Sequence, residues 1–282
     1  MSHRAPSPDT RRPRSRTRSR RRRRSVGGVI VGTIGELLVT AGVLIGLFVL
    51  WQLWWTDVVA LREQREMLVA LEWAAPPTLA EIEAAPPSPE RRDDIPVLPE
   101  PEFGEIFGQI YIPRFGTDFV TPLAGGVDRR QILDVIGVGH FPDTAMPGDL
   151  GNFATAGHRT TFGRPYNLIA ELQPGDAIVI RTADYWYVYR HVSSVVVYPR
   201  QVEVISPIPY RGIDGEFYLR PGDLMPEHLT ERWMTLASCH PMFSARERFV
   251  AHAIFDFWMP VSEGIPAPLL EAGVQIIGWE GN

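Results

Sequence analysis

The sequence predicts an all-β sandwich or barrel that is preceded by one transmembrane helix. Three observations lead to this prediction. From Phe103 onward, short runs rich in Val, Ile, Tyr and Phe are each bounded by Gly, Pro or Asp, which is the spacing of an all-β domain. Residues 26–55 form an apolar run with a single charge, Glu36. A proline-rich segment lies between the apolar run and the β-rich part.

The apolar run is long enough to cross a bilayer, because about 20 helical residues suffice. We expect a transmembrane helix within residues 26–55, with Trp51, Trp54 and Trp55 in the aromatic belt at its far end. A cleaved signal peptide is the alternative, although the run is long for one and no A-x-A cleavage site follows it promptly.

The charges are distributed unevenly along the 282 residues. All basic residues are arginine, and residues 1–25 carry eleven of them with one acid, a net charge of +10. The rest of the chain carries 17 Arg and 32 acids, a net charge of −15. Such a tail could bind nucleic acid, but an apolar span directly behind it favours a cytoplasmic Arg-rich tail under the positive-inside rule. We therefore expect no nucleic-acid partner and place the acidic body outside the cytoplasm.

Residues 56–103 are predicted to form a stalk. Residues 56–73 have the apolar spacing of a helix that continues out of the membrane. Eight prolines then fall between Pro76 and Pro101, a composition that favours a semi-rigid extended spacer or a disordered linker.

The β-rich part contains ten strand-like runs and two short helical turns. The helical turns are expected at residues 129–133 and 166–172. The strand-like runs are 106–112, 120–123, 132–138, 152–156, 177–182, 185–191, 194–198, 201–205, 233–239 and 249–257. A proline-rich stretch, 201–231, is expected to form a loop over one mouth of the barrel, and the last twenty residues a loosely attached tail.

The only cysteine, Cys239, ends one of these strands, and Pro241 follows in a position where a central strand cannot continue. Arg248 opens the next strand, and consecutive strands usually lie side by side, so Cys239 and Arg248 are expected to face each other across a hairpin. A guanidinium favours the thiolate form of a cysteine and can hold an oxyanion. Most free cysteines are small buried hydrophobic residues, which is the alternative. A lone thiol in an exported protein, however, has no internal disulfide partner and favours a reactive role.

Two histidines, His140 and His158, follow a glycine at the end of an apolar run, a strand-end position open to a cleft. Histidine can accept a proton from a nucleophilic thiol and pass one to a leaving amine. His240 adjoins Cys239, but neighbouring residues on a strand point to opposite faces, so it is not expected to serve the thiol directly. One cysteine without a carboxylate cluster does not match zinc-ligand spacing, and we expect no metal and no cofactor.

Three separated segments carry a family resemblance: A-G-H-R-T-T-F-G-R-P-Y, then T-L-A-S-C-H-P, then F-S-A-R-E-R-F. Together they resemble the sortases, the cell-wall cysteine transpeptidases of Gram-positive bacteria. The C-H-P and G-H-F-P-D-T-A-M-P-G-D-L-G-N segments look most like the class E sortases of actinobacteria. The resemblance covers about residues 104–257. One departure is Ser238, where the family usually has threonine, and serine keeps the hydroxyl.

The resemblance implies an eight-stranded β-barrel over residues 104–262, followed by a tail at 263–282. It also implies that Cys239 is the nucleophile, His158 the general acid/base and Arg248 the third catalytic residue. His140, Ser238 and Arg246 are implied as supporting residues near the site, with Arg246 the rival of Arg248.

The implied reaction is cleavage of an LPxTG- or LAxTG-type sorting signal between Thr and Gly, through a Cys thioester that a cell-wall amine resolves. The expected partners are secreted proteins with a C-terminal sorting motif, a peptidoglycan precursor that supplies the amine, and the cell membrane. The enzyme is expected as a single-pass membrane protein with an extracellular catalytic domain. A cysteine endopeptidase that only hydrolyses, or a non-catalytic module that binds cell-wall peptide, remain the alternatives.

Overall fold

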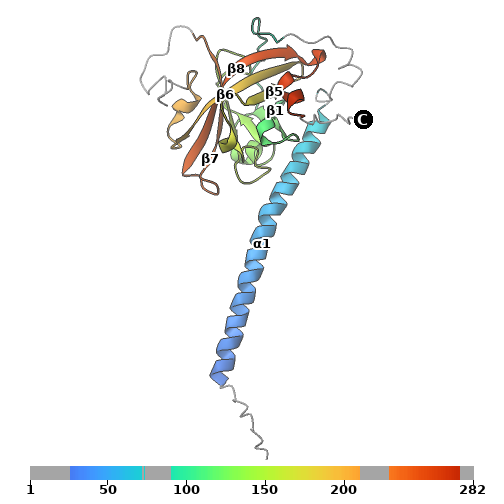
Figure 1. Cartoon of the computed structure of the whole chain (residues 1–282). Coiled ribbons are helices and arrows are strands. Elements are labelled where there is room, and N and C mark those ends of the chain that lie inside the picture. Colours follow the sequence, from blue (N-terminus) through green and yellow to red (C-terminus); the bar gives the residue numbers. More distant parts are fainter. Residues whose placement is uncertain (1–25, 72, 74–89, 210–228, 274–282) are drawn as a thin grey trace, which may run out of the picture. The chain divides into compact units, whose positions relative to one another are not determined.

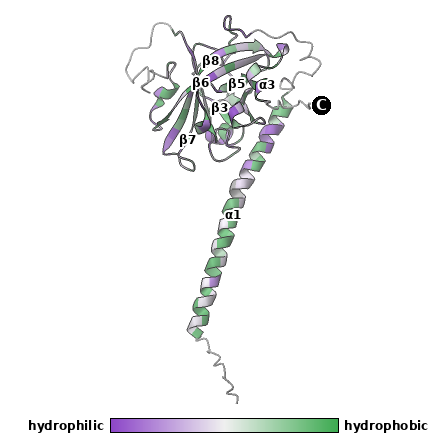
Figure 2. Cartoon of the chain, viewed as in Figure 1, coloured by the Kyte–Doolittle hydropathy of each residue, from purple (hydrophilic) through white to green (hydrophobic). Residues whose placement is uncertain are grey.

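The computed structural model of the protein describes residues 26–71, 73, 90–209 and 229–273. The chain divides into two compact units, Met1–Leu50 and Trp51–Asn282. Helix α1 (Val26–Ala70) begins in the first unit, where its residues are exposed and predominantly apolar (Figure 2). Among the described residues, α1 is the one helix long and apolar enough to cross a membrane. At about 1.5 Å per residue, its 45 residues exceed what a bilayer requires.

The second unit contains a closed eight-stranded barrel, which confirms the predicted fold class (Figure 1). The order of neighbouring strands around the barrel is β1-β2-β3-β4-β7-β8-β6-β5. The strands are β1 (Ile106–Tyr111), β2 (Val120–Gly125), β3 (Val138–His140), β4 (Gly151–Gly157), β5 (Ala177–Arg181), β6 (Tyr185–Val197), β7 (Arg232–His240) and β8 (Glu247–Pro260). Most neighbours are antiparallel, whereas β2–β3 and β4–β7 are parallel.

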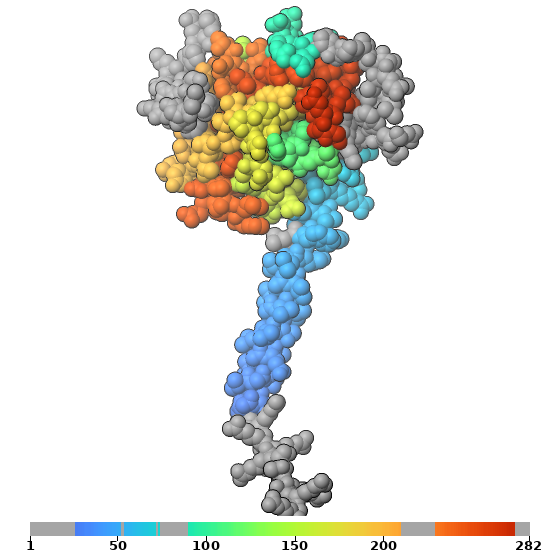
Figure 3. Space-filling model, in the orientation of Figure 1, coloured from blue at the N-terminus to red at the C-terminus, as the bar shows by residue number. Residues whose placement is uncertain are grey.

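The barrel interior is filled by apolar side chains from alternate positions of the strands. Ile110, Leu123, Phe153, Met234 and others of this cluster are fully buried. In the space-filling view, segments from the middle of the sequence, in yellow, lie next to the later strands, in orange (Figure 3). Alternation of this kind places every second residue of a strand in the core and leaves the others for the outer face.

Four predicted strand runs differ from the structure. The helical turn predicted at residues 129–133 is confirmed as η3 (Arg129–Leu133), which takes the first two residues of the strand predicted at 132–138. Residues 134–137 form a turn and a bend, and only Val138 enters strand β3. Ile132 and Ile136 are four residues apart, as on one side of a helix, and both are buried. Residues 201–205 contain the 3-10 turn η5 (Val202–Ile205). The runs at 185–191 and 194–198 form one long strand, β6, whose register against β8 shifts between His191 and Ser193. Within the helical turn predicted at residues 166–172, the structure has a 3-10 turn, η4 (Ile169–Glu171).

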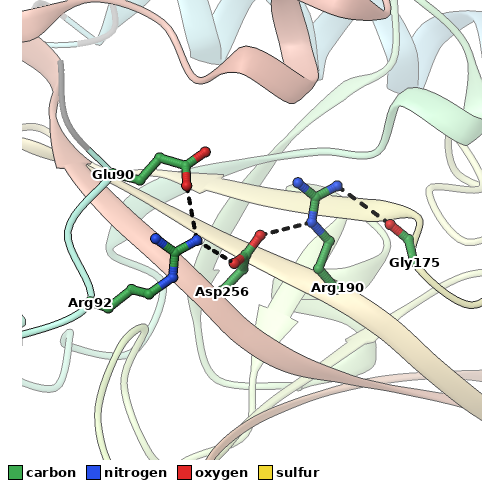
Figure 4. Close-up of polar contacts among 5 residues, drawn as sticks. All are labelled: Glu90, Arg92, Gly175, Arg190 and Asp256. Atoms are coloured by element: carbon green, nitrogen blue, oxygen red, sulfur yellow. Dashed lines mark hydrogen bonds and ion pairs between the residues drawn. The ribbon is translucent and has the colours of Figure 1, made fainter.

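Residues 90–103, expected as the end of the stalk, pack on the barrel instead. The backbone of Arg91 pairs with that of Trp258, and the hydroxyl of Tyr187 donates a hydrogen bond to the carbonyl of Pro96. Asp256 on β8 accepts a 3.0 Å hydrogen bond from Arg92 of this segment and a 2.9 Å hydrogen bond from Arg190 of β6 (Figure 4). Proline has no N–H to donate to a neighbouring strand, but it does not prevent such side-chain contacts. Residues 74–89 of the predicted spacer lie outside the described residues.

The described part of the predicted C-terminal tail is attached to the barrel. Ile265 is buried, and Leu269 of the short helix α3 (Ala267–Glu271) is 1% exposed. The indole of Trp186 donates a hydrogen bond to the carbonyl of Gly264 at 3.0 Å. Apolar burial of this kind explains why residues 263–273 stay on the barrel, and residues 274–282 lie outside the described part.

Candidate active site

Three neighbouring strands bring the predicted reactive residues into one row. Cys239 near the end of β7 pairs with Arg248 near the start of β8, which confirms the predicted hairpin contact. On the other side of β7, the parallel register with β4 runs up to the pair Ala156 and Ala237. Continuing this register by two residues places His158 beside Cys239. Adjacent strands are about 4.8 Å apart, so Cys239 and Arg248 are lateral neighbours, and His158 directly follows the end of β4.

The row opens into a cleft of about 580 Å³. Cys239, His158 and Arg248 all line it. The remaining lining residues are Arg129, Leu133, Phe141, Ala156, Gly157, Thr160, Thr161, Ala237, Ser238, Phe243, Ser244 and Ala245. The apolar residues among them suit an aliphatic side chain, and Cys239, His158 and Arg248 supply the reactive and charged groups.

Cys239 is a free, half-buried thiol on a rigid strand. The residue before it, Ser238, is 3% exposed, and its hydroxyl donates a 2.8 Å hydrogen bond to the carbonyl of Gly157. Gly157 immediately precedes His158. The Ser238 hydroxyl therefore ties together the two strands that carry the thiol and the imidazole, directly beside both groups.

The structure separates the two candidate arginines. Arg248 is half-buried in the cleft, and its Nη1 donates to the carbonyls of Ala245 and Glu247 at 3.0 and 2.9 Å. Arg246 is exposed in the loop between β7 and β8, and it is not among the residues that line the described cleft. The backbone bonds hold the Arg248 guanidinium in place near the thiol.

His158 has a partner that the sequence did not single out. Its Nε2 lies 2.6 Å from Oδ1 of Asp134, the residue that ends turn η3. The imidazole is 13% exposed and the carboxylate 17%. The ring of Phe162 lies near the imidazole, with ring centroids 5.3 Å apart and the ring planes tilted by 33°. Asp134 is 24 residues before His158 in the chain, in a run that resembled a strand, so no spacing pattern indicated this contact.

His140 lies inside the barrel, beneath the cleft lining. It is 1% exposed between the rings of Phe107 and Phe153, and its Nε2 lies 2.9 Å from the hydroxyl of Thr144. Burial lowers the pKa of His140 from its ordinary value. The next residue, Phe141, reaches the cleft.

His240 points away from Cys239, as strand alternation predicts. Its Nδ1 accepts a 2.8 Å hydrogen bond from Nη1 of Arg159, the residue after His158. The Arg159 guanidinium also lies over the ring of Phe249, 5.1 Å from its centroid. Within the described part of the chain, no group of three or more His, Cys, Asp or Glu side chains could hold a metal ion.

Comparison with known proteins places this geometry in a family. A model of the sortase domain matches residues 110–255. Sortase SrtE1 of Streptomyces coelicolor is 34% identical to this chain, in a match that covers 88% of this chain and 64% of that protein. Sortase SrtE2 of the same organism is 31% identical, in a match that covers 78% of this chain and 79% of that protein.

Solved structures give the same result. The SrtA sortase from Actinomyces oris is 34% identical, with a TM-score of 0.54 over 66% of this chain and 100% of that chain. The SrtF sortase from Corynebacterium diphtheriae is 32% identical, with a TM-score of 0.52 over 64% of this chain and 98% of that chain. On the match of the domain model and these relatives, the chain belongs to the sortases, a family of cysteine transpeptidases.

Proposed function

We propose that this protein is a membrane-anchored transpeptidase. It would cleave a C-terminal LPxTG- or LAxTG-type sorting signal between Thr and Gly and join the protein to a cell-wall amine. The observation that carries the proposal is the row of Cys239, His158 and Arg248 at one end of a single cleft. Cys239 and Arg248 are paired on adjacent strands, and His158 directly follows β4, the strand on the other side of β7.

The reaction begins when the Cys239 thiol loses its proton to His158 and the sulfur attacks the Thr carbonyl carbon. The carbonyl oxygen becomes an oxyanion in the resulting tetrahedral intermediate. The C–N bond to Gly then breaks, and the imidazolium of His158 gives its proton to the departing Gly amine. A thioester between Cys239 and the Thr carbonyl remains. A cell-wall amine attacks this thioester, its surplus proton passes to His158, and the sulfur leaves as the thiolate, so that an amide bond to the Thr carbonyl replaces the thioester.

Arg248 is suited to stabilise the oxyanion. Arginine has five N–H donors and no acceptor, and the described hydrogen bonds of Arg248 use only Nη1. Its Nε and Nη2 groups can therefore donate to the substrate carbonyl at the position opposite Cys239. Fixed donors of this kind are worth about 10²–10³ in turnover.

Helix α1 supports a membrane anchor, and the arginines before it support a cytoplasmic N-terminus. The cleft would then face the cell wall, where secreted proteins with a sorting motif and the amine of a peptidoglycan precursor are its partners. The apolar residues Leu133, Phe141 and Phe243 of the cleft suit the leucine that begins the motif.

Mass spectrometry of the detergent-solubilised protein tests the proposal. The protein is incubated with LAxTG and LPxTG peptides, with and without an added amine, and its mass is measured before and after. We expect a thioester on Cys239, and with amine a ligated peptide. Hydrolysed peptide in both conditions would indicate an endopeptidase, and peptide binding that survives alkylation of the single thiol would indicate a binding module. A Cys239→Ala variant that still ligates peptide would refute the assignment of the nucleophile.

A further inference from the structure

Asp134 ends a well-anchored turn, η3, whose residues Arg129 and Leu133 line the cleft. Its backbone N–H donates a 2.7 Å hydrogen bond to the carbonyl of Arg129, at the start of η3. The side chain of Asp128 caps the other end of the turn by accepting from two backbone N–H groups, those of Arg130 and Gln131. Ile132 within the turn is 1% exposed. A carboxylate on such a turn has little freedom to move away from its partner.

The contact between Asp134 and His158 is short and shielded. The distance from Nε2 to Oδ1 is 2.6 Å, the range of a charge-assisted hydrogen bond, and both side chains are less than one-fifth exposed. The other cation near this carboxylate, Arg129, has its Nε 3.7 Å from the same oxygen and is 75% exposed. Water therefore screens the Arg129 charge more than the His158 contact, which makes His158 the principal partner of Asp134.

This contact decides which imidazole nitrogen can react. An ionised carboxylate only accepts hydrogen bonds, so the Nε2 of His158 must carry a hydrogen. In the neutral ring, Nδ1 is then the free nitrogen. Cys239 and His158 line the same cleft, so Nδ1 is the ring nitrogen left to take the thiol proton.

On the basis of the proposed function, we infer that Asp134 is a positioning residue for His158. It orients the imidazole, keeps the hydrogen on Nε2, and supplies a negative charge beside the imidazolium that forms when the Cys239 proton reaches Nδ1. The same proton later leaves Nδ1 for the Gly amine. Asp134 stays ionised throughout and neither gains nor loses a proton. The site thus has an Asp–His–Cys arrangement in addition to the cation Arg248.

An Asp134→Asn variant of the full-length, detergent-solubilised protein provides the test. Asn keeps the size of the side chain but loses the charge, and its amide can hold the imidazole in the other tautomer. We expect the single-turnover rate of thioester formation and kcat to fall by about 10²-fold, with KM nearly unchanged. Asp134→Glu is expected to restore part of the rate. Arg130→Ala, an exposed substitution on the same turn, is the control and keeps the wild-type rate.

Nitrogen NMR of the ¹⁵N-histidine-labelled protein gives a second readout that a merely structural role would not change. The wild type is expected to show His158 with the hydrogen on Nε2, and Asp134→Asn to show a shift towards the Nδ1–H tautomer. An unchanged kcat in Asp134→Asn would overturn the inference. A faster Asp134→Asn would also overturn it, because Asp134 would then hold His158 away from Cys239. A wild type that forms no thioester refutes the proposed function, and the tautomer measurement still decides the role of Asp134.

Discussion

Replacing Ser238 by alanine is expected to weaken the protein and the reaction together. The hydroxyl of Ser238 is buried and bridges to the carbonyl of Gly157 at 2.8 Å. Removing it deletes one buried hydrogen bond and leaves an acceptor without its donor, a loss of about 1–3 kcal/mol in the free energy of unfolding. For a domain of this size, each kcal/mol shifts Tm by about 2–4 °C, so we expect a decrease of several degrees.

The effect on activity follows from the position of the lost bond. Gly157 precedes His158, and Ser238 precedes Cys239, so this bond fixes the spacing of the two reactive groups. A shift of about 1 Å between reacting groups can lower the rate by up to about 10²-fold. We expect kcat for peptide ligation to fall more than KM rises.

Ser238→Thr is the matched control, because threonine keeps the hydroxyl and suits a strand. Differential scanning fluorimetry and steady-state ligation assays of both variants check the prediction. Equal losses of Tm and kcat in Ser238→Ala and Ser238→Thr would refute the reasoning, since the hydroxyl would then not be the group that matters.

Three further predictions concern other groups. Burial lowers the pKa of His252 to about 3, so the folded protein keeps this imidazole neutral, whereas the unfolded chain protonates it below about pH 6.5. The free energy of unfolding should therefore fall by about 2 kcal/mol between pH 8 and pH 5. Urea unfolding at both pH values checks this, and the His252→Asn variant should show a smaller decrease in the free energy of unfolding. Arg248→Ala should lower kcat by about 10²-fold or more, and Arg246→Ala should leave it unchanged; the reverse order in ligation assays would reassign the oxyanion donor. A double-mutant cycle on Arg159 and His240 should give a coupling energy of about 0.5–3 kcal/mol in thermal unfolding, and strict additivity would contradict the 2.8 Å contact.

The sequence predicted the contact between Cys239 and Arg248 because chain connectivity fixes it, whereas it indicated His158 through its position at a strand end and the family resemblance. Cys239 and Arg248 lie on consecutive strands, and a hairpin must place them together. Asp134 could not be found in this way, because its contact with His158 depends on how η3 packs against the end of β4. The segment at 90–103 was missed for a similar reason. Its prolines describe the local backbone, whereas its attachment comes from partners such as Tyr187 that are far along the chain.

Residues 132–138 show where apolar pattern alone is ambiguous. The run I-L-D-V-I-G-V satisfies a short strand, and it also places Ile132 and Ile136 one helical turn apart. In the structure both isoleucines are buried, as the helical spacing requires, and the polar residue between them, Asp134, contacts His158. The helical turn predicted at residues 129–133, and not the overlapping strand predicted at 132–138, therefore ends at the residue that contacts His158.

Strand register is the quantity on which this site depends most. Cys239 pairs with Arg248, while the neighbouring pair Ser238 and Phe249 belongs to the opposite face of the pleat. A slip of one residue between β7 and β8 would turn the Cys239 side chain away from Arg248 and break the row. Bonds within the connecting loop resist such a slip, because Arg248 itself donates to the carbonyl of Ala245. The guanidinium that we assign to the oxyanion thus also helps to fix the register that places it opposite the thiol.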